Sequence, residues 1–87
     1  MDLYKKNPDI IEAVLEDDIC LFDPAKAQYL NLNPTASFIW SNLGDPIDIE
    51  KMVDKLINKY NVNRGICYTQ TKEFVKRLTN LDLIILK

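Results

Sequence analysis

Three short stretches in the first third of the chain have the residue pattern of β-strands. Each is rich in β-branched, aromatic or aliphatic residues, and in the third stretch two leucines alternate with Tyr29 and Asn31. Acidic residues at 16–18 form the first predicted turn, and Asp23 and Pro24 suit the first two positions of a type I turn. The pattern predicts an antiparallel meander with strands over residues 10–15, 19–22 and 27–32.

The apolar spacing then changes to the 3.6-residue period of helices. Asn33 and Pro34 suit the cap and the first position of a helix, which we expect to end at Gly44 in a left-handed conformation. The apolar face of this helix consists of Ala36, Ile39, Trp40 and Leu43. Asp48 is the expected cap of a second helix. The apolar face of the second helix consists of Ile49, Met52, Val53, Leu56, Ile57 and Tyr60.

A third helix is predicted over residues 64–80, with Asn63 as its cap and Thr69 as an alternative. Its continuous apolar stripe consists of Cys67, Thr71, Phe74, Leu78 and Leu81. A second, partly apolar stripe contains Tyr68, Val75 and Thr79, with Lys72, Lys76 and Arg77 beside it. We interpret four of the larger apolar residues as core: Phe38, Trp40, Phe74 and Leu78.

The ends of the chain are less regular. Residues 1–9 have no periodicity and are expected to form a flexible arm before a single domain over residues 10–87. Residues 81–87 fit either the end of the third helix with a tail or a short closing strand. Three strands followed by three helices predict an α+β domain, in which amphipathic helices cover one face of a three-stranded antiparallel sheet.

Composition argues against an enzyme. The 87 residues include no histidine, two cysteines and two glycines. Histidine-dependent nucleophiles, the usual zinc sites, a CxxC pair and a glycine-rich phosphate loop are therefore excluded. We expect no catalytic residues, no metal and no cofactor. The first residues contain no apolar h-region, so we expect no signal peptide, and no apolar run reaches the ~18 residues that span a bilayer. With few cysteines, this favours a cytoplasmic protein that has free thiols at Cys20 and Cys67 and binds no membrane.

Charge is distributed unevenly along the chain. Residues 1–50 carry ten acidic and three basic residues, a net charge of −7, whereas residues 51–87 carry a net charge of +5. The difference suggests a domain with one basic face, although ordinary solvated helix faces explain it equally well.

The third predicted strand has no proline and can lie at a sheet edge, where its unpaired N–H and C=O groups can template another strand. A peptide added there gains affinity from main-chain hydrogen bonds and specificity from side-chain pockets. In this interpretation the third helix forms the other wall, with Tyr68, Val75 and Thr79 as an apolar floor and Lys72 and Lys76 as basic flanks. Two alternatives remain open: the edge is merely tolerated, or it pairs with a second copy of the chain.

The stretch from Leu21 to Trp40 resembles the PqqD family. The most specific match is Leu32-Asn33 followed by Thr35, Ala36 and Trp40. The resemblance extends over about residues 10–84 and includes the helix that ends in Tyr60-Asn61-Val62. Asp82 departs from the family pattern, which commonly has glycine near the end of the last helix.

The resemblance implies a winged-helix-like fold and a role as a recognition element for ribosomally synthesised, post-translationally modified peptides (RiPPs). Such a domain binds the leader peptide of the precursor as an extra strand, beside the third strand and the third helix. The implied site consists of Gln28, Tyr29, Leu30, Asn31, Leu32, Tyr68, Lys72, Val75, Lys76 and Thr79. The implied partners are the precursor leader and a modifying enzyme or leader protease subunit.

Three further alternatives remain at this point. The family includes both the leader-binding subunit of split lasso-peptide proteases, which we favour, and the partner of a radical SAM enzyme in pyrroloquinoline quinone synthesis. A winged helix also suggests DNA binding, but the net charge of −2 opposes contact with phosphates, so no nucleic-acid partner is expected. A module that only forms dimers through its strand edge is the third alternative.

Overall fold

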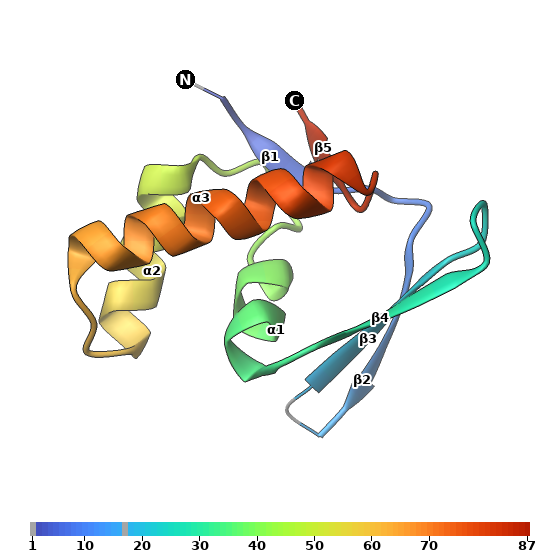
Figure 1. The fold of residues 1–87 in the computed structure, drawn as a ribbon, viewed down its shortest axis with the longest axis horizontal. Coiled ribbons are helices and arrows are strands. Elements are labelled where there is room, and N and C mark those ends of the chain that lie inside the picture. Colours follow the sequence, from blue (N-terminus) through green and yellow to red (C-terminus); the bar gives the residue numbers. More distant parts are fainter. Residues whose placement is uncertain (1, 17) are drawn as a thin grey trace.

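The structure, a computed structural model, describes residues 2–16 and 18–87. Met1, in the predicted arm, and Asp17, in the predicted turn at 16–18, lie outside the described residues. Figure 1 shows the elements in their chain order. They are β1 (Tyr4–Lys6), β2 (Ile11–Leu15), β3 (Asp18–Asp23), β4 (Gln28–Leu32), α1 (Pro34–Ser41), α2 (Ile49–Lys59), α3 (Arg64–Asn80) and β5 (Ile84–Leu86).

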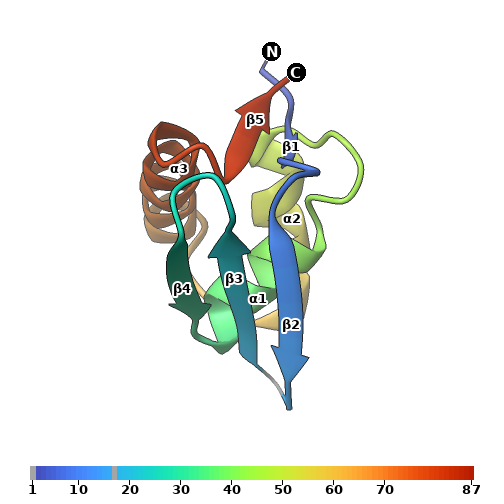
Figure 2. The ribbon, with the colours of Figure 1, turned by 90° about the vertical axis from the view of Figure 1, so that its right-hand side faces the viewer.

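The predicted meander is confirmed as a three-stranded antiparallel sheet in the order β2-β3-β4. Leu21 in the central strand lies opposite Glu12 of β2 and Leu30 of β4. Figure 2 shows the three strands side by side in front of the helices, so the helices cover one face and leave the other open. This α+β arrangement with three helices is compatible with the predicted winged-helix-like fold.

The three predicted helix caps are also confirmed. The side chains of Asn33, Asp48 and Asn63 each accept a hydrogen bond from the backbone N–H three residues further on. Thr69, the alternative start of the third helix, lies inside α3. The caps therefore fix where α1, α2 and α3 begin.

The predicted end of the first helix is wrong. Helix α1 ends at Ser41 with Asn42 as its C-cap, and Gly44 does not adopt a left-handed conformation. The N–H of Asn42 donates to the carbonyl of Ile39 at 3.1 Å, and the N–H of Leu43 donates to the carbonyl of Trp40 at 3.0 Å. These tight i→i−3 bonds close the last turn, so no left-handed residue is needed there.

The predicted flexible arm is wrong over Tyr4–Lys6, which forms β1 and pairs antiparallel with β5. The N–H of Tyr4 also donates to the carbonyl of Ile47 at 2.8 Å, and the N–H of Lys6 donates to that of Leu43 at 2.8 Å. All of these are main-chain bonds, which leave no periodic signal in the side chains. For residues 81–87, where the sequence fits either a helix end with a tail or a short closing strand, the structure shows the closing strand β5.

Asp82 turns the chain back from α3 to β5. Its φ of 63° is left-handed, a conformation that favours glycine. The N–H of Asp82 donates to the carbonyl of Thr79 at 3.0 Å, and the N–H of Leu83 donates to that of Leu78 at 2.9 Å. These two bonds form a Schellman motif, a helix end that favours glycine at its left-handed residue. This accounts for the glycine that is common at this place in the family that the sequence resembles.

Helix α1 fastens the sheet to the core. The buried Ser37 hydroxyl accepts the N–H of Ile19 at 2.9 Å and donates to the carbonyl of Leu32 at 3.1 Å. Trp40 is 1% exposed, and its indole N–H donates to Glu12 of β2 at 2.6 Å. Trp40 and Leu78 are core residues as predicted, whereas Phe38 and Phe74 are only half-buried. None of the helices in residues 2–16 and 18–87 is long and apolar enough to cross a membrane.

Candidate functional site

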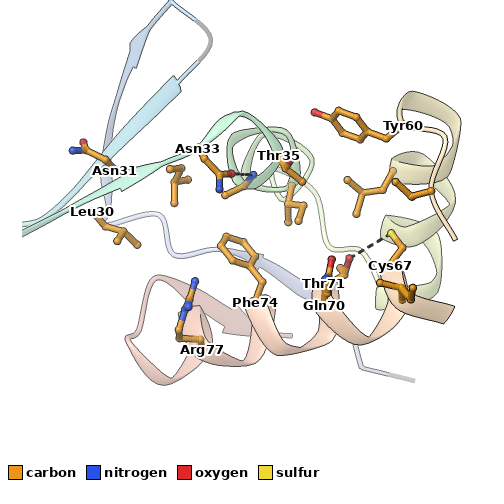
Figure 3. A pocket seen from close by; sticks show the side chains of 16 residues that line it. Leu30, Asn31, Asn33, Thr35, Tyr60, Cys67, Gln70, Thr71, Phe74 and Arg77 are labelled. Carbon is orange, nitrogen blue, oxygen red and sulfur yellow. Dashed lines mark hydrogen bonds between the residues drawn. The ribbon is translucent and has the colours of Figure 1, made fainter. Parts of the chain in front are cut away.

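A groove of about 450 Å³ lies between edge strand β4 and helix α3 (Figure 3). The start of α1 and the end of α2 close it on the remaining sides. Its lining residues are Leu30, Asn31, Leu32, Asn33, Thr35, Ala36, Ile39, Leu56, Tyr60, Val62, Ile66, Cys67, Gln70, Thr71, Phe74 and Arg77.

The lining combines an apolar base with a few polar side chains. Leu32 is 3% exposed, while Ile66 is 61% exposed and Val62 is 47% exposed, so apolar surface reaches from the core to the rim. The Asn33 side chain caps α1, and the hydroxyl of Thr71 lies 3.8 Å from Cys67 Sγ. The side chains of Thr35, Tyr60, Gln70 and Arg77 make no hydrogen bond to another described residue, so their polar groups are available to a ligand.

The two long walls are held together near the β3–β4 turn. Lys26 Nζ, in that turn, donates to the carbonyl of Leu81 at 3.0 Å and to Asp82 Oδ2 at 3.2 Å. A lysine at a helix C-terminus also complements the helix dipole. At the opposite end β4 runs directly into α1 through Asn33. Contacts within the chain thus join the two walls at both ends of the groove.

Three of the five strand residues of the predicted site line this groove. Leu30, Asn31 and Leu32 line the groove as expected. Gln28 and Tyr29 belong to the same strand but line a smaller cavity of about 90 Å³ together with Leu81 and Leu83. Tyr29 is 74% exposed and its ring packs against Phe22 with centroids 4.6 Å apart, on the open face of the sheet.

The helix side of the predicted site lies outside this groove. None of the five predicted α3 residues lines it: Tyr68, Lys72, Val75, Lys76 and Thr79. Val75 is 2% exposed and belongs to the core, and Lys72 and Lys76 face solvent. Thr79 bonds within its own helix, its hydroxyl donating to the carbonyl of Val75 at 2.7 Å.

Four of the predicted residues lie on the opposite side of α3 from the groove, because 68, 72, 76 and 79 each stand two residues, ~200° around the helix, beyond the lining positions 66, 70, 74 and 77. Neighbouring residues on an α-helix lie ~100° apart, so Phe74 faces the groove while Val75, the next residue, faces the core. The observed buried stripe is Cys67, Thr71, Val75 and Leu78. The groove side of α3 consists instead of Ile66, Gln70, Phe74 and Arg77, with Phe74 half-buried. The i, i+4, i+7 spacing of Gln70, Phe74 and Arg77 was a usable signal for a second, amphipathic face.

The groove has features that suit the binding of a peptide. No group of acidic and cysteine residues able to hold a metal ion occurs in residues 2–16 and 18–87. Cys20 and Cys67 are both free, and Cys67 is buried in the groove wall. An open strand edge beside an apolar groove is a surface on which an extended peptide can pair and insert alternate side chains.

Comparisons with known proteins agree with this geometry. A search of curated protein sequences finds no significant match. The structure of TbiB1 in complex with the TbiA(beta) leader peptide is similar, with a TM-score of 0.84, 27% identity, and coverage of 92% of this chain and 93% of that one. A lasso peptide synthetase B1 complexed with the leader peptide has a TM-score of 0.82 and 23% identity, over 94% of this chain and 96% of that one, and so shares the fold. The family model for coenzyme PQQ synthesis protein D matches residues 18–84, and the chain therefore belongs to the PqqD family.

Proposed function

We propose that this chain binds the leader peptide of a RiPP precursor as an additional strand on β4. The observation that carries the proposal is the open edge of β4 lying against an apolar groove walled by α3. The similarity to TbiB1, whose structure holds a leader peptide, supports it independently.

Main-chain pairing supplies the sequence-independent part of this binding. Only one side of β4 pairs with another strand, β3, so along its other side alternate N–H and C=O groups face outward. A peptide in extended form pairs with these groups whatever its side chains are. The five residues of β4, Gln28–Leu32, set the length of the paired segment.

Side chains on one face of the added strand supply the specificity. Because successive residues of a strand point to opposite faces, every second peptide side chain enters the groove. There it meets Leu30 and Phe74 near one end and Ile66 and Val62 near the other. The largest gain comes from apolar peptide residues that cover these exposed surfaces.

The domain acts by recognition, and a separate enzyme supplies the chemistry. The absence of histidine from the sequence and the lack of a nucleophile–base pair in the groove support this division. For that enzyme we propose a leader protease of the lasso-peptide type, because a lasso peptide synthetase B1 complexed with the leader peptide has the same fold. A radical SAM enzyme of the pyrroloquinoline quinone type is the alternative, supported by the name of the family model.

Calorimetry with the synthetic leader peptide of a RiPP precursor, taken from a precursor gene found near the gene for this chain, tests the proposal. We expect a Kd between nanomolar and micromolar, about −12 to −8 kcal/mol. Hydrogen exchange of the complex should show new protection in β4 and along the groove side of α3, with no new protection in β2.

Two results would contradict the proposal. The first is a lack of binding to that leader by a domain whose circular dichroism shows it to be folded. The second is protection confined to the β2 edge. Sedimentation of the free and leader-bound domain distinguishes a dimer paired through β4, because the leader would dissociate such a dimer.

A further inference from the structure

The groove has a single charged lining residue. Of the 16 described residues that line it, only Arg77 carries a charge. Arg77 projects from the last turn of α3, and Figure 3 shows it pointing toward Leu30, beside Phe74. It therefore stands at the end of the groove where β4 leaves the β3–β4 turn, whereas the opposite end, near Tyr60 and Val62, is apolar and neutral.

The charge of Arg77 has no partner among the described residues. Its guanidinium carbon Cζ lies over the ring of Phe74, 5.8 Å from the centroid, within the range of a cation–π contact. Glu73 lies four residues earlier on the same helix, a spacing that permits an ion pair, yet the described side chains form none with Arg77. This cation–π contact favours a guanidinium position at the groove and uses none of its N–H donors.

Arg64, the other arginine of the sequence, has a structural role and differs from Arg77 in its contacts. Arg64 pairs with Asp54 at 2.8 Å and with Glu50 at 3.1 Å and so links α3 to α2. The hydrogen bonds that Arg64 donates to Asp54 and, next in size of effect, to Glu50 raise the pKa of Arg64 above its usual value. Arg77, by contrast, forms no ion pair with a carboxylate of residues 2–16 or 18–87.

We propose that Arg77 is a specificity-determining residue that selects peptides with an aspartate or glutamate at one fixed position of the added strand. This inference rests on the proposed function and names the chemistry of its ligand. The selected position is the groove-facing residue beside Leu30. Peptide residues two and four positions away on the same face meet the apolar part of the lining, so the acidic residue has a defined register relative to the apolar anchors.

The test is selection from a displayed library of random peptides on the wild-type domain and on three variants. Wild type should enrich an acidic residue at one position relative to the apolar anchors. Arg77→Glu should change the preference at that position to lysine or arginine, and Arg77→Gln should abolish it. Lys76→Glu is the matched control, because it makes the same charge change one residue away on the solvent side of α3 and should keep the wild-type preference.

A charge-swap cycle on one selected peptide makes the test quantitative. Replacing its acidic residue by lysine should weaken binding to wild type by about tenfold or more, because like charges then meet at a partly desolvated site. Binding of the lysine peptide to Arg77→Glu should recover most of that loss. Thermal unfolding shows whether each variant is folded. If Arg77→Glu does not fold, the comparison uses Arg77→Gln instead.

The outcomes separate this inference from the function on which it rests. Peptides that bind in the groove and lose affinity on Phe74→Ala, but show no charge preference that responds to Arg77, overturn the inference and leave peptide binding intact. Failure of the folded wild-type domain to enrich any peptide overturns both. A charge preference shared equally by the Lys76→Glu and Arg77→Glu variants overturns it too, since it would reflect the overall charge of α3.

Discussion

The two edge strands of the sheet have very different surroundings. Strand β4 runs beside α3, and its inward residues Leu30 and Leu32 are half-buried and buried. All five residues of β2 are exposed, including Val14 at 68% and Leu15 at 65%. Both edges offer the same unpaired main-chain groups, so backbone pairing alone does not distinguish them. The difference shows that a strand edge becomes a selective site when a second element supplies a wall for the side chains.

The largest effect is expected from removing the anchor of that wall. Val75→Asp places a charge at a position that is 2% exposed, which should cost about 3 kcal/mol or more and unfold the domain. Urea unfolding followed by circular dichroism measures it. Lys76→Asp, the neighbouring residue on the exposed side, should leave the unfolding midpoint nearly unchanged. A folded Val75→Asp variant of normal stability would mean that α3 packs with a different face toward the core.

Removing the aromatic part of the wall should affect binding and leave the fold intact. Phe74→Ala deletes a half-buried ring that faces β4, so affinity for the leader peptide should fall roughly 10- to 100-fold, as for an aromatic anchor at an interface. Calorimetry measures the change. Ile11→Ala, on the exposed β2 edge, is the control and should bind normally. Equal losses in the two variants would remove the distinction between the edges.

The third expected effect concerns what β2 contributes. Glu12 accepts the indole N–H of Trp40 at 2.6 Å and pairs with Lys6 at 3.1 Å, so β2 joins α1 to β1. Glu12→Ala leaves the nearly buried indole N–H without its partner and should destabilise the fold by about 1–2 kcal/mol, with leader affinity of the folded fraction unchanged. Lys6→Met keeps the indole bond and should cost less. Reduced affinity in Glu12→Ala at conditions where it is fully folded would make β2 part of the site.

The smallest effect is expected at the clamp across the groove end. Lys26 pairs with Asp82 through side chains that are 39% and 74% exposed, so Lys26→Met should cost less than about 1 kcal/mol of stability. Because the clamp holds the turn of β4 against the end of α3, leader affinity should fall slightly, by a factor that shrinks at high salt. Lys72→Met removes an exposed lysine elsewhere on α3 and should change nothing. A salt-independent loss would point to a direct contact between Lys26 and the peptide.

Most of the fold follows from local signals in the sequence. Asn33, Asp48 and Asn63 are side-chain caps, and side-chain caps can be identified from residue type and spacing. Pairing of β1 with β5 left no such trace, because it depends on main-chain bonds between the two ends of the chain.

The candidate site was harder to predict than the fold. Leu30, Asn31 and Leu32 follow from strand alternation once β4 is known to be an edge. On α3, two stripes sharing Cys67, Thr71 and Leu78 fit the helical period, one through Phe74 and one through Val75. Only packing against α2 and β5 decides which of the two residues is buried. The valine fills the core, and the larger aromatic ring is left to face the groove.

The β1–β5 ribbon has a consequence for how the domain can be joined to other polypeptides. It brings the first and last strands side by side, and Figure 1 shows both chain ends emerging together beyond α3, on the side away from α1. A protein segment fused to either end, or to both ends, therefore leaves the domain on the side of the β1–β5 ribbon and does not cover the peptide groove. The fold is suited to insertion as a cassette into an exposed loop of a larger host, because such a loop needs only two nearby attachment points.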